Sequence, residues 1–213
     1  MRRAFTVVDG ALAPEVAAPL REQLDNESFV ERENPRDGLT YKGICTLPLP
    51  GFEKMLADAL FVPESWIKPS LNFWRLAFDG DSPEFSVHSD DVMNKHVALL
   101  YFSRDEHSTG GTAFWRHESG LTDMPTKEAL EKAGHDFPTF CYWLASEVKD
   151  PSKWTCTDII GFKFNRLLIS PTQVFHSRAP FVGWGEDAKN GRLVWTCFFD
   201  IEPPAPAEPT KSK

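Results

Sequence analysis

The residues best suited to chemistry are two histidines and an aspartate at the ends of short β-like runs. His88 and Asp90 stand in the run Val-His-Ser-Asp-Asp, and His176 stands in Gln-Val-Phe-His-Ser-Arg. On a strand, residues i and i+2 point to the same face, so His88 and Asp90 are expected to converge on one ion. Two imidazoles and a carboxylate form the facial triad that binds non-haem Fe(II) and leaves positions open for substrates, whereas zinc prefers a closed tetrahedral set or three ligands and a water. Asp91 is the alternative carboxylate, although its odd spacing directs it to the other face.

A single His-x-Asp pair is weak evidence, because polar strand ends in solvent are common. A basic residue strengthens the pattern: Arg192 opens the run Arg-Leu-Val-Trp-Thr-Cys-Phe-Phe-Asp. If the strands around residue 184 pair antiparallel about it, His176 and Arg192 face each other. The guanidinium would then lie beside the metal, available for a bidentate carboxylate partner. Thr196 shares this face by parity, and Arg178, two residues after His176, competes for the same carboxylate.

Short β-like runs must position these side chains. They are punctuated by Gly and Pro and are expected at residues 70–78, 84–88, 96–102, 112–115, 162–169, 173–176 and 192–200. Apolar residues at helical spacing predict helices over about 14–26 and 51–60, and helix-forming stretches occur at 125–133 and 140–148. The expected fold is mainly β with flanking helices (α+β), a sandwich or roll.

The predicted organisation is one domain over residues 1–202, followed by a Pro-rich, disordered tail at 203–213. Within the domain, residues 1–68 form an N-terminal support that is mostly helical. The β core takes residues 69–115 and 162–201, and residues 116–161 form a helical insertion expected to cover the pocket and select the substrate.

The amino-acid composition disfavours some classes of binding partner. The 213 residues carry a formal net charge of −8, which disfavours a broad nucleic-acid footprint and an acidic membrane surface. The N-terminus has no apolar run long enough for a signal peptide, no stretch is long enough to span a bilayer, and the four cysteines form no CxxC pair. We therefore expect a soluble, cytoplasmic protein with reduced thiols. The 17 Phe and 7 Trp suggest a core or pocket built from large flat side chains.

The order of the motifs resembles a known family. The runs AFDGDSPEFSVHSD, HVALLYFS, GGTAFW, FNRLLISPTQVFHS and GRLVWTCFFD follow one another as in the Fe(II)- and 2-oxoglutarate-dependent dioxygenases, specifically their prolyl-4-hydroxylase-like branch. The resemblance covers about residues 70–200 and also extends to a bacterial group of unassigned function. It implies a double-stranded β-helix, with His88, Asp90 and His176 as iron ligands and Arg192 binding the far carboxylate of 2-oxoglutarate.

The same resemblance implies that Tyr101 and Thr196 also line the 2-oxoglutarate pocket. The implied reaction consumes O2 and 2-oxoglutarate, hydroxylates a C–H bond of a small molecule, amino acid or peptide side chain, and releases succinate and CO2. One departure is Phe78 in Phe-Asp-Gly, where some relatives carry a tyrosine, so one 2-oxoglutarate or substrate contact is missing.

The candidates for substrate contacts are Trp115, His117 and Arg178, which lie near strand ends expected to border the pocket. For His117 the competing interpretation is a satisfied surface histidine. Two other functions stay open at this point. One is a non-catalytic metal-binding β-roll, and the other is an oxygenase of nucleic-acid bases, which would need a basic channel that the acidic composition disfavours.

Overall fold

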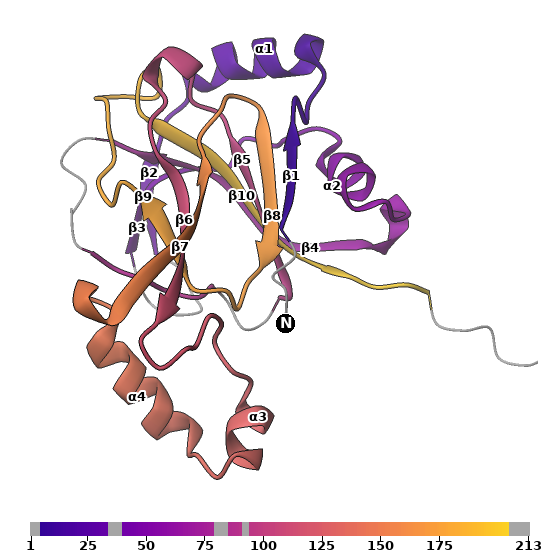
Figure 1. Cartoon of the computed structure of the whole chain (residues 1–213). Helices are drawn as coiled ribbons and strands as arrows, with labels where there is room; N and C mark the ends of the chain where they lie inside the picture. Colours follow the sequence, from indigo (N-terminus) through magenta and orange to yellow (C-terminus); the bar gives the residue numbers. More distant parts are fainter. Residues whose placement is uncertain (1–4, 34–39, 79–84, 91–93, 205–213) are drawn as a thin grey trace, which may run out of the picture.

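The computed structural model describes residues 5–33, 40–78, 85–90 and 94–204 (Figure 1). In this part of the chain the strands form two antiparallel sheets packed face to face. The larger sheet has the order β1-β8-β5-β10-β4-β3-β2, and the smaller has the order β7-β6-β9. The strands are β1 (Thr6–Asp9), β2 (Val30–Glu33), β3 (Thr40–Cys45), β4 (Ile67–Ala77), β5 (His96–Tyr101), β6 (Gly111–His117), β7 (Trp154–Gly161), β8 (Arg166–Pro171), β9 (His176–Ala179) and β10 (Arg192–Ile201).

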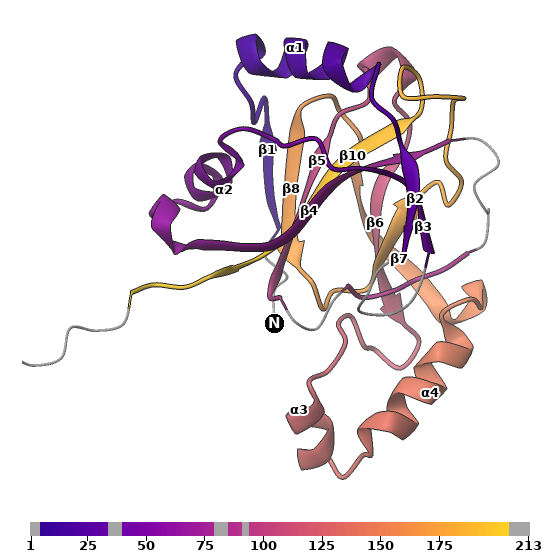
Figure 2. The same ribbon diagram turned by 180° about the vertical axis from the view of Figure 1, so that it is seen from behind.

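Two helices cover the outer face of the larger sheet: α1 (Pro14–Leu24) and α2 (Phe52–Leu60) (Figure 2). Pro14 suits a first helical turn because the missing N–H needs no partner there. Each helix turns an apolar stripe to the sheet, where it meets the alternate residues of β10 and β4, among them Trp195 and Trp74. This layer is the principal hydrophobic core.

The space between the two sheets holds a second apolar cluster. It consists of Tyr101, Phe114, Leu168, Val174 and Val194, with Phe162 packed against it. Because side chains alternate along a strand, the same β10 that buries Trp195 under the helices presents Arg192, Val194 and Thr196 to the inside. The architecture is a double-stranded β-helix with flanking helices, as the family resemblance implied.

The remaining helices, α3 (Lys127–Lys132) and α4 (Phe137–Glu147), lie between β6 and β7, at the end of the roll away from α1 (Figure 1). The side chains of Thr126 and Asp136 cap their N-termini. Short 3-10 turns occupy Glu64–Trp66, Asp105–His107 and Pro151–Lys153. None of the described helices is both long and apolar enough to cross a membrane.

Several strands differ from the sequence expectation. Residues 154–161, assigned to the insertion, form β7, which pairs along the whole of β6 from Gly111↔Gly161 to His117↔Trp154. The part that leaves the sheets is therefore residues 118–153. β2 and β3 lie within residues 1–68, which were expected to form a mostly helical support. β2 is fully exposed and β7 largely so, so neither shows the apolar alternation that marks a strand in sequence.

Two other expected strands are displaced. The run 162–169 becomes regular only at Arg166, and the run 173–176 precedes β9, which begins at His176. The expected strand 84–88 is an extended segment with one isolated bridge, at His88, among its described residues. Residues 203–204 are described as irregular, and the rest of the predicted tail lies outside the described residues.

Candidate metal centre

The three predicted ligands meet at the mouth of the roll. One ligand atom from each of His88, Asp90 and His176 lies within 4.8 Å of the others. Asp90 Oδ2 is 3.4 Å from His176 Nε2, and the two imidazole rings are 4.5 Å apart between centroids. Two nitrogens and a carboxylate oxygen gathered on one side form a donor set suited to non-haem Fe(II).

Backbone pairing, rather than a regular strand, holds these residues together. The N–H of His88 donates to the carbonyl of His176 at 3.0 Å, and the N–H of His176 donates back at 2.8 Å. The N–H of Asp90 donates to the carbonyl of Thr172 at 2.8 Å. The extended segment is therefore fixed at both ligands, and it acts as a partial extra strand beside β9. The alternative ligand Asp91 lies outside the described residues.

The contacts of both histidines are compatible with metal binding. His176 Nδ1 lies 2.9 Å from the carbonyl of Val174; a donor at Nδ1 leaves the Nε2 lone pair free for a ligand. His88 is exposed as a whole residue, yet desolvation by the surrounding protein and the nearby His176 lower the pKa of its imidazole to about 4. His88 is therefore neutral near pH 7 and able to coordinate.

Arg192 lies inside the roll at the start of β10. It is 7% exposed, and no described carboxylate pairs with it. Burial lowers its pKa to about 10, with further lowering from Arg178 and Arg75 that Tyr101 opposes, so the guanidinium is still charged at pH 7. Its Cζ lies 5.7 Å from the centroid of the Phe162 ring, and its buried Nε has no hydrogen-bond partner. A buried charge without a counterion is costly, which makes Arg192 a fitting receptor for an anion.

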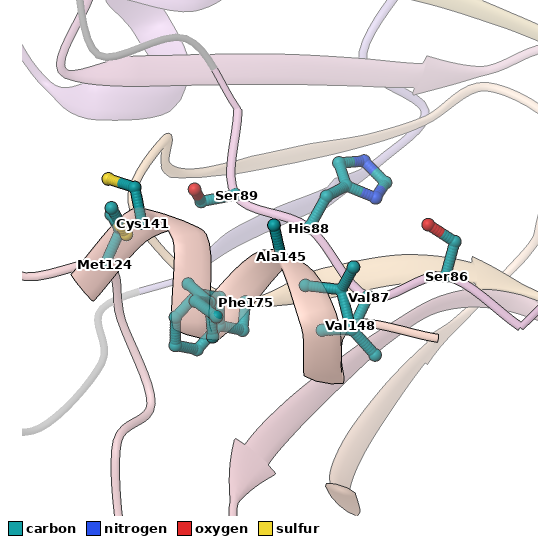
Figure 3. A pocket seen from close by; sticks show the side chains of 10 residues that line it. Ser86, Val87, His88, Ser89, Met124, Cys141, Ala145, Val148 and Phe175 are labelled. Carbon is teal, nitrogen blue, oxygen red and sulfur yellow. The ribbon is translucent and has the colours of Figure 1, made fainter. Parts of the chain in front are cut away.

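A groove adjoins the ligand segment on the side of α4 (Figure 3). Its volume is about 280 Å³. Residues 86–89 form one wall, and Cys141, Leu144, Ala145 and Val148 form the other. Met124 and Phe175 complete the lining, which is mostly apolar, with serine hydroxyls at its edge. His88 thus belongs both to the ligand set and to the rim of this groove.

A comparison of the sequence with protein-family models identifies the family of this chain. The model of a family described as "Family of unknown function (DUF6445)" matches residues 84–199, more than half of the chain. The chain belongs to this family. The matched stretch includes all three predicted ligands and Arg192, so the candidate site of this DUF6445 protein lies within the region that the family model covers. No curated protein matches the sequence.

Solved structures share the fold of this DUF6445 protein. AviO1 from Streptomyces viridochromogenes Tue57 has a TM-score of 0.53 at 13% identity, covering 98% of this chain and 94% of that one. EvdO2 from Micromonospora carbonacea var. aurantiaca, complexed with 2-oxoglutarate, has a TM-score of 0.50 at 12% identity, covering 98% and 91%. HygX from Streptomyces hygroscopicus, with iron bound, has a TM-score of 0.50 at 12% identity, covering 92% and 82%. At such identity the likeness concerns the fold.

The other residues predicted around 2-oxoglutarate lie on the inner face of the larger sheet. Tyr101 is fully buried, and its hydroxyl donates to Thr112 Oγ1 at 2.7 Å; burial raises its pKa, so the phenol keeps its proton. Thr196 lies four residues beyond Arg192 on the same face of β10, opposite Leu99 of β5. Phe78, by contrast, packs against the core under the helices, on the outer side of the sheet.

The expected antiparallel pairing of residues 176 and 192 is wrong. β9 pairs with β6 in the smaller sheet, whereas β10 lies between β4 and β5 in the larger one. The connection through residues 180–191 crosses from the smaller sheet to the larger one. Consecutive strands of a rolled sheet often belong to opposite sheets in this way. His176 and Arg192 therefore belong to opposing sheets instead of neighbouring strands.

The predicted substrate contacts have different surroundings. Trp115 Nε1 donates to Ser177 Oγ at 2.9 Å, and its ring packs against Phe85 and Phe181. Arg178 pairs with Thr112 in register and acts electrostatically on Arg192. Neither residue lines the groove beside His88.

His117 is 2% exposed, and its Nε2 lies 2.7 Å from Glu147 Oε2 of α4. Its Nδ1 accepts the N–H of Ser119 at 3.2 Å, so the ring proton is on Nε2. Together with Glu118 these two residues form a second group of possible metal ligands. Glu118 forms an ion pair with Lys153, whereas His117 Nε2 and Glu147 Oε2 are buried and make a close contact without hydrogen-bond geometry. The contacts of His117 hold α4 against β6.

Sequence reasoning missed three residues close to Arg192. Arg75 lies opposite Val194 on the inner face of β4, and its charge reaches both Arg192 and His88. The sequence did contain a signal for Arg75. It lies between Trp74 and Leu76, which are buried under the helices, so strand alternation places Arg75 on the opposite face, between the two sheets. Phe162 and Trp184 come from irregular segments, where the sequence offers no such periodicity.

Proposed function

We propose that this protein is an Fe(II)- and 2-oxoglutarate-dependent oxygenase. The observation that carries the proposal is the pairing of two sites in one roll: a His-Asp-His donor set at the mouth, and inside it a buried, uncompensated arginine at the start of β10. The His-Asp-His set can bind the metal, and the buried arginine can bind one carboxylate of a dicarboxylate cosubstrate. Iron and 2-oxoglutarate occur in fold neighbours, which supports the same pair here.

The residues of this chain would have separate roles in binding the metal and the cosubstrate. His88, Asp90 and His176 would hold Fe(II), and the hydrogen bond from His176 to Val174 would keep its ring in the ligating orientation. Arg192 would bind the far carboxylate of 2-oxoglutarate, in an environment where the aromatic rings of Tyr101 and Phe162 keep water away. Bound iron would supply the activation of O2, in a reaction that would place one oxygen atom in succinate and the other in the product and would release CO2.

The substrate is proposed to be a small molecule, amino acid or peptide side chain with an apolar part. The mostly apolar groove between residues 86–89 and α4 supports this, because it adjoins the metal ligand His88. Hydroxylation is the proposed outcome, by analogy with the prolyl-4-hydroxylase-like branch that the motifs resemble. The fold neighbour SnoN is an epimerase crystallised with Fe3+, alpha ketoglutarate and nogalamycin RO, so epimerisation at a C–H centre is the competing outcome.

The test is anaerobic addition of 2-oxoglutarate to the Fe(II)-loaded protein. A 2-oxoglutarate-dependent metal-to-ligand absorption band is expected, followed by succinate release when O2 and substrate are supplied. His176→Ala should abolish the band, whereas His135→Ala, an exposed histidine before α4, should leave it intact. No band in the wild-type protein would overturn the proposal. A band without any succinate, across amino acids, peptides and aromatic metabolites, would favour a non-catalytic metal-binding roll.

A further inference from the structure

One aromatic ring joins three polar side chains inside the roll. Phe162 stacks on Tyr101 at 4.4 Å between centroids and 15° between planes. The guanidinium of Arg192 lies 5.7 Å from the centroid of the same ring, and the Trp184 ring meets it edge-on at 5.5 Å and 82°. Trp184 and the arginine proposed to bind the cosubstrate therefore contact the same ring.

The backbone places Trp184 there independently of the rings. Gly183 fits so closely against β4 that an added Cβ would lie 2.5 Å from the carbonyl oxygen of Phe78 and 2.6 Å from the carbonyl carbon of Ala77. Ala77 is the register partner of Arg192. An added Cβ on Gly191 would lie 3.3 Å from the carbonyl oxygen of Trp184. The loop thus folds back so that the main chain of Trp184 lies beside the start of β10.

Two donors in this region are buried without partners: Arg192 Nε and Trp184 Nε1. Native proteins rarely leave buried polar atoms unpaired, and a bound ligand is a common reason when they do. Tyr101, the other donor expected here, already gives its proton to Thr112. Among these three side chains, the arginine and the indole are the ones with a free N–H.

We propose that the indole N–H of Trp184 is a second hydrogen-bond donor to the carboxylate that Arg192 binds. The inference rests on the proposed function, because it assigns a positioning group for 2-oxoglutarate. A carboxylate has two oxygens, so it can accept from a guanidinium and an indole together. The indole is neutral and can only donate, so it adds affinity for an acid without adding a further positive charge beside Arg192.

The experiment compares two substitutions that each remove one unpaired, buried indole N–H. Trp184→Phe removes the donor near Arg192. Trp195→Phe removes a matched donor on the opposite face of β10, where Trp195 packs against Phe52. In anaerobic titrations of the Fe(II)-loaded protein, Trp184→Phe should weaken 2-oxoglutarate binding about tenfold, the usual scale of one hydrogen bond to a charged group. Trp195→Phe should leave this affinity unchanged.

A second measurement uses the wild-type protein, so it does not depend on a variant that folds. With ¹⁵N-labelled tryptophan and zinc in place of iron, the Trp184 indole N–H resonance should shift when 2-oxoglutarate is added, and the Trp195 resonance should stay. The inference is overturned if Trp184→Phe binds 2-oxoglutarate as the wild type does, if both variants weaken binding equally, or if the Trp184 resonance does not move. If the wild type binds no 2-oxoglutarate, the proposed function itself fails, which the titration shows separately.

Discussion

The two ends of the roll are built very differently. The end that holds Arg192 consists of long paired strands, with a buried network of side chains behind them. The end near α3 and α4 is a segment of mostly exposed residues attached to the sheets at a few points (Figure 1). The difference indicates that the proposed cosubstrate site is a fixed part of the scaffold, whereas the segment beside the groove can vary without disturbing it.

The network behind Arg192 explains why this end is fixed. Ser103 accepts the N–H of Leu193 and donates to the carbonyl of Gly191, both at 2.8 Å, so it clamps the residues on either side of Arg192. Arg21 of α1 donates to the carbonyl of Ala188, which anchors the loop that leads into β10.

By contrast, α4 is held by a small apolar cluster, in which Leu144 packs with Trp154 and Phe175, and by hydrogen bonds near its C-terminal end. The N–H of Val87 donates to the carbonyl of Val148 at 3.0 Å, and Trp154 Nε1 donates to the carbonyl of Glu147 at 2.9 Å. The Glu147 side chain meets His117, as described above. The first of these bonds reaches the segment that carries His88, so α4 contacts the same short stretch of backbone as two of the proposed metal ligands.

The largest effect is expected from Asp25→Ala. Asp25 pairs with the 3%-exposed Arg21 and with Arg104, and its removal leaves a buried guanidinium uncompensated. The free energy of unfolding should fall by about 3 kcal/mol, measured by urea denaturation. The matched control is Asp58→Ala, which removes an exposed pair with Lys54 and should cost less than about 1 kcal/mol. Similar losses in both variants would contradict the idea that this end depends on a buried network.

The next effect is the loss of 2-oxoglutarate affinity in Arg192→Gln. Glutamine retains a hydrogen-bond donor but no charge, so binding should weaken about 100-fold, near the upper range for charged hydrogen bonds. The folded state should not suffer, because the substitution removes a buried charge without a counterion. Isothermal titration of the metal-loaded protein measures this. Arg178→Gln is the comparison: an equal or greater loss there would move the carboxylate site to Arg178.

The same contrast separates what the sequence could predict from what it could not. Motif order and strand parity place His88, Asp90, His176 and Arg192 in one roll, because ligand types and alternation are local properties. The pairing partners of β9 and β10 depend on a long connection, and no local signal encodes which sheet a strand joins. Exposed edge strands such as β7 carry no apolar pattern, and Trp184 lies in an irregular loop.

A smaller effect is expected from Glu147→Gln, which neutralises the partner of His117. The amide has nearly the same shape as the carboxylate, so the substitution removes only the charge from the 2.7 Å contact with His117 Nε2. The free energy of unfolding should fall by about 1 kcal/mol, and the amides of α4 should exchange with deuterium faster. Glu131→Gln in α3, whose pair with Lys127 is exposed, is the control and should change neither. Faster exchange across β10 as well would show that the two ends are coupled.

The smallest structural effect, and the sharpest test of the contrast, is Ala145→Phe. Ala145 faces the groove from α4, so a phenyl ring there fills the groove while the sheets stay untouched (Figure 3). If the groove holds the apolar part of the substrate, substrate-stimulated succinate release should fall at least tenfold, because displacing even part of an apolar group costs more than about 1.4 kcal/mol. The affinity for 2-oxoglutarate should stay at the wild-type value. Equal loss of both would mean that the groove and the cosubstrate site are one space, and unchanged succinate release would place the substrate elsewhere in the mouth of the roll.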